Sequence, residues 1–294
     1  MEVHSFSTVN LIFNQQTEID NGNVLACKNI TFVNHSDIGT MYVTQCNDLY
    51  SSDIGINSLE IDVCHDFTCT GNAEISDKII INTCHNVSFA GETGGTTGKV
   101  EIERCNNVDF TGNVEIDSFH TVLCSNNITF GNNVTLNNFD VDSCKDITFG
   151  RDTSIINCDV DLCNDITVTG VATITTFDVD SGHYISFLSD SGITTFDVDS
   201  CHNLGFAGET IISSFDIDTC VNANFEKQTK ITTFTDTENS KNFDFYENVI
   251  FENDVISNST GSFSFVKNDR SDITVTFGTT ADPKNFSHTG GNTS

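Results

Sequence analysis

A short motif recurs about every 19 or 20 residues along the chain. It consists of a small residue, an aliphatic residue three positions later and Phe five positions later; one copy reads CKNITF from Cys27 and another CHNLGF from Cys201. We call the small residue the anchor, and it stands at Thr8, Cys27, Cys46, Cys64, Cys84, Cys105, Cys124, Cys144, Cys163, Gly182, Cys201, Cys220, Ser240 and Thr260. A fixed period of this size over most of a chain is typical of a solenoid, in which each repeat forms one coil stacked on the next.

The residues around the anchor predict strands. Each central coil reads I-x-x-F-D-V-D-x-C-x-[ND]-I-x-F-x-G, and its FDVD and IxF segments alternate apolar and polar residues. This is the strand period of two, and no segment shows the helical period of 3.6. β-Branched and aromatic residues fill the inward positions, as half-buried strands favour. Asn or Asp stands two residues after most anchors, which predicts a corner near the left-handed backbone region that these residues tolerate.

Two families share such a pattern. Most of the chain resembles a right-handed parallel β-helix of the pectate-lyase-like kind, with short strands joined by tight corners. The string from Ile174 to Ile185 is also similar to a leucine-rich repeat, LxxLxLxx[NC]xxL, so a short leucine-rich-repeat-like solenoid is the alternative. That unit is at the short limit for leucine-rich repeats, and IxF stands where a helix would need Ala, Leu or Glu. We therefore predict an all-β protein, a single right-handed parallel β-helix of about 13–14 coils of 19–20 residues.

The pattern covers most of the chain without an internal linker. We predict a β-solenoid over residues 1–275 and a polar C-terminal tail or cap over residues 276–294. The single proline, Pro283, lies in this tail, as expected if no interior strand can lose a ladder N–H. Neither a secretory signal nor a run of about twenty apolar residues is visible, so we expect no membrane insertion. The location is otherwise open, and a virion or cell-surface position would suit such a protein.

The cysteines follow the repeat. Ten of the 12 cysteines occupy the anchor column, where Gly, Ser and Thr also occur, and Cys69 and Cys158 stand in Phe columns. This pattern favours buried free thiols that pack as small apolar groups. Disulfides between stacked coils and a metal site are the alternatives. Free thiols would favour a reducing compartment during folding.

The charge is strongly negative and ordered. The chain has 12 Lys and Arg against 42 Asp and Glu, a formal net charge of −30, which argues against nucleic acid or anionic lipid as a partner. Two Asp columns stand two residues apart, opposite to the buried Phe and Val, so we predict that both lie on one outer face. The first column is Asp140, Asp159, Asp178, Asp197 and Asp216, and the second is Asp142, Asp161, Asp180, Asp199 and Asp218.

Stacked carboxylates repel one another across neighbouring strands, so something must reduce this electrostatic repulsion. Hydration and salt, raised carboxyl pKa values or a bound cation could each do so. Rows of carboxylates suit Ca²⁺, which takes six to eight oxygen ligands in loose geometry. We therefore treat all ten aspartates as candidate metal ligands. A basic protein surface is the alternative partner, and a merely solvated face is the third interpretation.

The same repetition argues against catalysis. A carboxylate pair that recurs identically in every coil does not single out one active site, and His65, His85, His183 and His202 follow anchors at a corner where exposed polar residues are expected. We therefore predict a non-enzymatic structural or interaction protein with no required cofactor, a surface, virion or filament component. Such a rod could also self-associate end to end or side by side. The alternative is a carbohydrate-active or carbohydrate-binding β-helix, for which paired Thr and Ser from Thr175 to Thr233 offer a hydroxyl row.

Overall fold

The chain folds as an all-β solenoid of about 13 coils, whose coils pair in parallel, and the described residues contain no helix. The structure, a computed structural model, describes residues 2–5, 10–13, 17–236, 240, 242–253, 255–257, 262–265, 275–279, 282–283 and 286–288. This confirms the right-handed parallel β-helix class that the repeat predicted, and it rules out the leucine-rich-repeat alternative. Among the described residues, no helix is long and apolar enough to cross a membrane.

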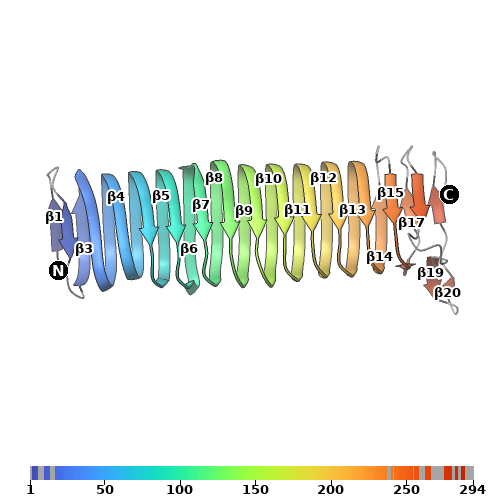
Figure 1. Cartoon of the computed structure of the whole chain (residues 1–294), viewed down its shortest axis with the longest axis horizontal. Coiled ribbons are helices and arrows are strands. Elements are labelled where there is room, and N and C mark those ends of the chain that lie inside the picture. The colour runs from blue at the N-terminus through green and yellow to red at the C-terminus, as the bar shows by residue number, and fades with distance from the viewer. Residues whose placement is uncertain are drawn as a thin grey trace. The chain divides into compact units, whose positions relative to one another are not determined.

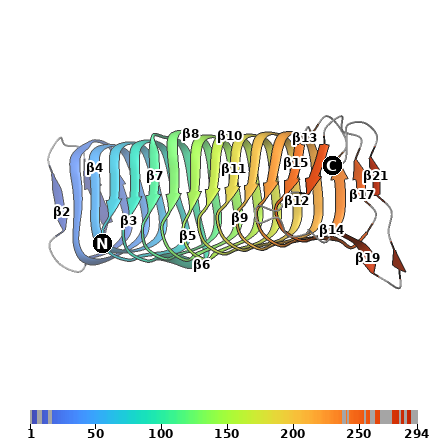
Figure 2. The same cartoon turned by 45° about the vertical axis from the view of Figure 1, so that its right-hand side comes forward.

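The chain divides into two compact units, Met1–Gly150 and Arg151–Ser294. In each unit the coils lie side by side, and a view turned by 45° shows their strands on more than one side of a shared interior (Figures 1 and 2). Unit 1 contains β1 (Glu2–Ser5), β2 (Leu11–Phe13), β3 (Thr17–Val24), β4 (Cys27–Cys69), β5 (Ala73–Phe89), β6 (Thr93–Cys105), β7 (Asn107–Phe110), β8 (Val114–Phe130) and β9 (Val134–Phe149).

Unit 2 contains the most regular coils, and its strands become shorter toward the C-terminus. Its strands are β10 (Thr153–Val168), β11 (Ala172–Phe187), β12 (Ser191–Phe206), β13 (Thr210–Phe225), β14 (Thr229–Asp236), β15 (Asn242–Phe245), β16 (Val249–Phe251), β17 (Val255–Ser257), β18 (Ser262–Phe265), β19 (Val275–Thr279), β20 (Asp282–Pro283) and β21 (Phe286–His288). Each of the strands β10 to β13 covers most of one coil and bends where the ladder pairing skips a residue.

The repeat sets the strand register. Between β11 and β12 each apolar position of the repeat pairs with the same position in the next coil, so Ile174 is opposite Ile193 and Phe177 is opposite Phe196. These side chains are buried, whereas the residues between them point outward. Because side chains alternate along a strand, a slip of one residue would expose the whole apolar set, and the alternation therefore fixes the register.

The corner after the anchor differs from the sequence expectation. Among the described non-glycine residues only Asp152 has a positive φ, of 40°, so the left-handed corner predicted for the Asn and Asp column is wrong. These side chains instead form a hydrogen-bonded ladder from coil to coil. In unit 2 the Asn222 Nδ2 group donates to Asn203 Oδ1 at 2.9 Å, and Asn242 Nδ2 donates to Asn222 Oδ1 at 3.0 Å. A side-chain amide both donates and accepts, so each Asn can bond to both neighbouring coils.

Breaking this ladder at its middle member is expected to destabilise unit 2. Asn222→Ala removes one bond to Asn203 and one from Asn242, and we expect the free energy of unfolding to fall by about 2 kcal/mol, since each net hydrogen bond contributes roughly 1 kcal/mol. Urea unfolding measures the change. Asn224→Ala, two residues along the same strand and outside the ladder, is the control. An equal loss in both variants would show that the ladder contributes nothing specific.

The cysteines lie where the repeat puts them. All 12 are buried and none forms a disulfide, which agrees with the interpretation as reduced thiols. Within the anchor column the Cys201 and Cys220 sulfurs approach to 2.9 Å, and the Cys220 thiol donates to the Asn222 carbonyl oxygen at 3.2 Å. Cys69 pairs in register with Phe89, as its place in a Phe column predicted, and burial raises the pKa of this thiol to about 11.

The C-terminal part of unit 2 keeps parallel pairing in places. β19 pairs with β16 and β21 pairs with β17, both in parallel, whereas β19 and β20 are antiparallel. The division into a solenoid over residues 1–275 and a tail or cap over 276–294 stays a prediction, because much of that tail lies outside the described residues. The predicted anchors Thr8 and Thr260 lie outside them as well.

Candidate functional site

The first Asp column of unit 2 lies on the outer side of flat strand segments. Asp178 stands between Phe177 and Val179, which are buried, so its carboxylate points away from the core. The ladder then places one Asp directly opposite the next on four successive strands. In register along β10 to β13 these residues are Asp159, Asp178, Asp197 and Asp216.

The second Asp column lies at the adjacent corner. The pairing of β10 with β11 passes from Val160–Val179 to Leu162–Ser181, so Asp161 is skipped. The equivalent residues on the four strands are Asp161, Asp180, Asp199 and Asp218. The second column therefore flanks the first, and the eight carboxylates come from four neighbouring coils of unit 2. The first column lies on the outer side of the strands as the sequence predicted, whereas the second lies at the corner and not on the same strand face.

Both burial and repulsion act on the first column. Partial burial, and then the charges of Asp178 and Asp216, raise the pKa of Asp197 to about 6. The pKa of Asp178 is raised by partial burial and by the charges of Asp180 and Asp199. Asp216 shifts in the same direction for the same leading reason, with Asp218 as its strongest charged neighbour. From the sequence we expected like-charge repulsion alone to raise these pKa values, whereas desolvation by partial burial is the larger cause.

The two remaining candidate aspartates lie in unit 1. Asp140 and Asp142 are on β9, where Asp140 pairs in register with His120 of β8. The His120 Nδ1 atom lies 3.0 Å from Asp140 Oδ2, and the ligand atoms of His120, Asp140 and Asp142 all lie within 4.8 Å of one another. Sequence reasoning missed this histidine, although its position one coil before Asp140 in the first column is visible in the repeat.

The eight aspartates of unit 2 form no cluster of that tightness within the described residues. Parallel strands hold equivalent residues ~4.8 Å apart, so a cation that lies between two stacked carboxylates would contact one oxygen-bearing group from each coil. Such a site would need water for its remaining ligands, which Ca²⁺ accepts readily because its geometry is loose.

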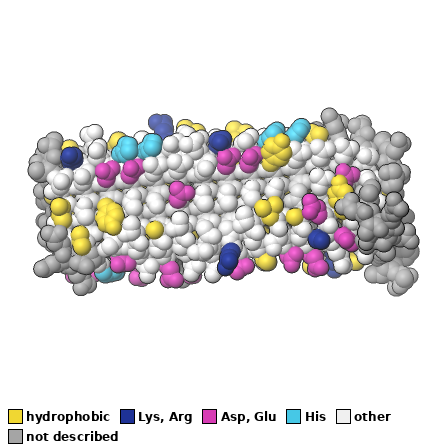
Figure 3. Space-filling view, in the orientation of Figure 1, with side chains coloured by type: hydrophobic (Ala, Val, Ile, Leu, Met, Phe, Trp, Pro, Cys, Tyr) yellow, Lys and Arg dark blue, Asp and Glu magenta, His cyan; other side chains and the backbone are white. Residues whose placement is uncertain are grey.

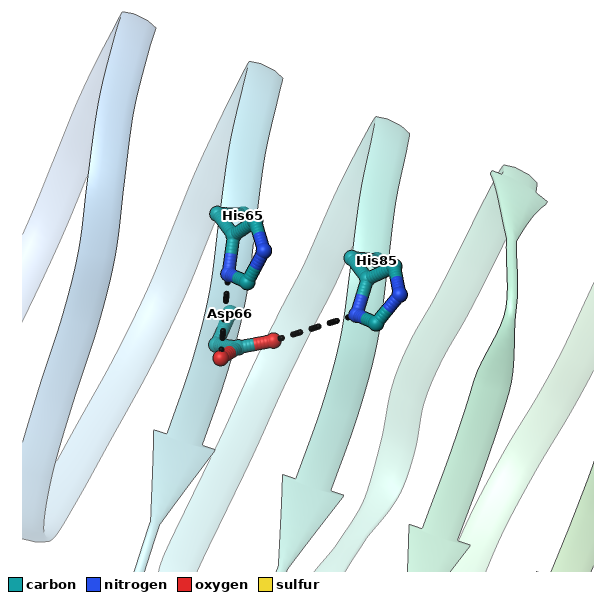
Figure 4. Close-up of side chains that lie close together, drawn as sticks. All are labelled: His65, Asp66 and His85. Carbon is teal, nitrogen blue, oxygen red and sulfur yellow. Dashed lines mark ion pairs between the residues drawn. The ribbon is translucent and has the colours of Figure 1, made fainter.

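The histidines at the corner also come together. His65 and His85 stack with ring centroids 4.9 Å apart and planes inclined by 14°, and Asp66 lies against both rings (Figure 4). His183 and His202 stack in the same way in unit 2, at 5.0 Å and 10°. The signal was available in the sequence, since histidine directly follows the anchor in adjacent coils. We expected only exposed polar residues there.

Other features belong to the alternative carbohydrate interpretation. Thr176, Thr195, Ser214 and Thr233 stand in register on β11 to β14, on the same outer side as the first Asp column. In unit 1 a shallow groove of about 290 Å³ is lined by acidic residues and two glycines, Glu18, Asp20, Asp37, Glu74, Gly39 and Gly55 among them. Neither feature tests carbohydrate binding or catalysis, so the carbohydrate alternative stays a prediction.

The surface view places these groups in context. On the face that Figure 3 shows, Asp and Glu (magenta) occur in short groups on a largely neutral surface, and His (cyan) lies beside some of them. Lys and Arg are sparse on this face. No protein-family model matches the chain, and no curated protein or solved structure is significantly similar to it.

Proposed function

We propose that this protein is a non-enzymatic structural or interaction protein whose acidic face in unit 2 binds divalent cations, with Ca²⁺ as the best-suited ion. The acidic face is the set Asp159, Asp161, Asp178, Asp180, Asp197, Asp199, Asp216 and Asp218. The observation that carries the proposal is the in-register column on β10 to β13, where three carboxyl groups have raised pKa values.

The four strands of this face contribute no Lys or Arg. The sequence contains no Lys or Arg from residue 152 to residue 226, a stretch that includes all four strands. Oxygen ligands without competing amines suit hard cations, and a cation between two coils would lower the repulsion that the fold imposes. The repetition of the same pair in each coil also supports a binding face more than a catalytic site.

The proposal predicts a cation-specific gain in stability. Ca²⁺ at 100 times its dissociation constant would stabilise the folded state by ~2.7 kcal/mol per site, provided that the unfolded chain does not bind it. We therefore expect millimolar CaCl₂ near neutral pH to raise the melting temperature more than NaCl of equal ionic strength does. Differential scanning calorimetry of the full chain measures both.

Two variants with the same change in charge show where the effect arises. Replacing Asp178, Asp180, Asp197 and Asp199 with Asn should remove the difference between the two salts. Replacing Glu60, Glu101 and Glu103 with Gln and Asp62 with Asn removes as many charges from unit 1 and should leave the difference intact. If the wild-type protein responds equally to CaCl₂ and NaCl, the face does not select divalent cations, and a basic protein surface becomes the better candidate partner.

A further inference from the structure

Two histidines and an aspartate of unit 1 present three metal-binding atoms in one place. His65 follows the anchor Cys64 and His85 follows the anchor Cys84, and these anchors are opposite each other in the ladder. His65 Nδ1 lies 3.1 Å from Asp66 Oδ2, and His85 Nδ1 lies 3.7 Å from Asp66 Oδ1 (Figure 4). All three ligand atoms lie within 4.8 Å of one another, and the side chains are accessible to solvent.

We propose that His65, Asp66 and His85 bind a divalent transition-metal ion, with Zn²⁺ as the reference ion. Two imidazole nitrogens and one carboxylate oxygen form a ligand set that Zn²⁺ accepts at about 2.0–2.2 Å, with a fourth position left open. Imidazole favours such borderline metals over Ca²⁺, so this site differs in chemistry from the acidic face of unit 2.

Rotation of the side chains would bring the three atoms onto one ion. Both Nδ1 atoms already face the Asp66 carboxylate, so an ion bound there would replace two histidine–aspartate contacts with three metal–ligand bonds. A second carboxylate lies close by, because Asp48 Oδ1 is 3.8 Å from His65 Nδ1. Its negative charge favours a cation, and water or this carboxylate could fill the fourth position.

Neighbouring amides hold the site in place. Asn86 Nδ2 donates to Asp66 Oδ1 at 2.8 Å and also lies 2.8 Å from His85 Nδ1. Asn106 Nδ2 lies 3.4 Å from the other nitrogen of the same ring, His85 Nε2. Groups of this kind orient ligands and typically change metal affinity ~10–100-fold. A bound metal would displace Asn86 from His85 Nδ1 while its bond to Asp66 could remain.

The chain contains a natural control for the role of the carboxylate. His183 and His202 stack with nearly the same geometry in the same column of unit 2. The residues that follow them are Tyr184 and Asn203, so neither coil of this pair carries the carboxylate that Asp66 supplies on the His65 coil. Asp165, one coil earlier and opposite Tyr184, is the carboxylate of this column that precedes the pair. If ring stacking alone sufficed, both pairs would bind metal equally well.

The test is a titration of the reduced chain with Zn²⁺ at pH 7.5, in which isothermal titration calorimetry measures the binding. Excess Ca²⁺ in the buffer occupies oxygen-only sites. We expect binding that His65→Gln, His85→Gln and Asp66→Asn each weaken at least ~10-fold, whereas the His183→Gln/His202→Gln double variant keeps wild-type affinity. Circular dichroism establishes that each variant is folded.

A second probe separates this site from the buried thiols. Co²⁺ bound by nitrogen and oxygen gives visible bands without the intense near-ultraviolet charge transfer that thiolate ligands produce. We expect the wild-type protein to show the visible bands alone, and we expect His85→Gln to lose them. Three results would overturn the proposal. They are wild-type affinity in folded His65→Gln and His85→Gln, an equal loss in the His183→Gln/His202→Gln variant, or a thiolate spectrum.

Discussion

Replacing Phe196 with Ala is expected to lower the free energy of unfolding by about 3–5 kcal/mol, the usual cost of deleting a buried aromatic ring. Phe196 is fully buried on β12. Its ring stacks on Phe177 at 5.2 Å and on Phe215 at 5.1 Å, and it meets Phe206 of the same coil edge-on at 5.7 Å. The variant therefore opens a cavity in a column that three coils share, and close packing leaves no neighbour free to fill it.

Urea unfolding, followed by circular dichroism, measures the loss. Leu188→Ala removes an exposed apolar side chain from the adjoining part of unit 2 and should change stability by no more than ~0.5 kcal/mol. The dependence of the free energy of unfolding on urea concentration must be compared as well, because a solenoid interrupted at one coil can unfold in parts. A loss below about 1 kcal/mol for Phe196→Ala, with an unchanged dependence on urea, would contradict the proposed role of the stacked column.

The fold could be predicted from the sequence because each coil repeats the same constraints. Phe177 and Phe196 occupy one position of the repeat, and in the structure they are opposite each other in the ladder. Parallel in-register stacking brings every column together, so the period alone predicts which residues are neighbours. For the same reason the repeat correctly predicted that Asp159, Asp178, Asp197 and Asp216 stand opposite one another in the ladder.

The corners could not be predicted in the same way. Asn222 was expected to adopt a left-handed backbone, and its actual role depends on bonds to residues one coil away in either direction. Local preference describes a single residue, whereas the ladder is a property of the stack. His65 and His85 were overlooked for a related reason, because each is an ordinary exposed corner residue until the neighbouring coil and Asp66 are considered together.

The acidic face makes stability depend on pH in a defined direction. Asp178, Asp197 and Asp216 have folded pKa values above the value of ~3.9 for an Asp in an unfolded chain. In the interval between the two values the folded protein binds more protons than the unfolded chain does. These groups therefore lower the stability of the folded state increasingly as pH rises from about 4. The loss is complete above the folded pKa, which is about 6 for Asp197.

Asp197→Asn should accordingly stabilise the protein at pH 7.5. One pKa unit corresponds to ~1.4 kcal/mol, but Asp197 is partly solvated, so screening reduces the expected gain to about 1 kcal/mol. The triple variant Asp178→Asn/Asp197→Asn/Asp216→Asn should gain more, because it removes the repulsion between neighbours. Its stacked amides could also bond from coil to coil, as Asn203, Asn222 and Asn242 already do.

Urea unfolding of the triple variant and the wild-type protein at pH 4 and pH 7.5, without divalent cations, tests this reasoning. The difference in stability should be small at pH 4, where the Asp197 carboxyl group of the wild-type protein is largely protonated, and larger at pH 7.5. Replacing Glu60, Glu101 and Glu103 with Gln gives the same change in net charge outside the column and should produce a smaller gain. A triple Asn variant that is no more stable than the wild-type protein at pH 7.5 would mean that the column carries no electrostatic cost, and a bound cation would then have nothing to offset.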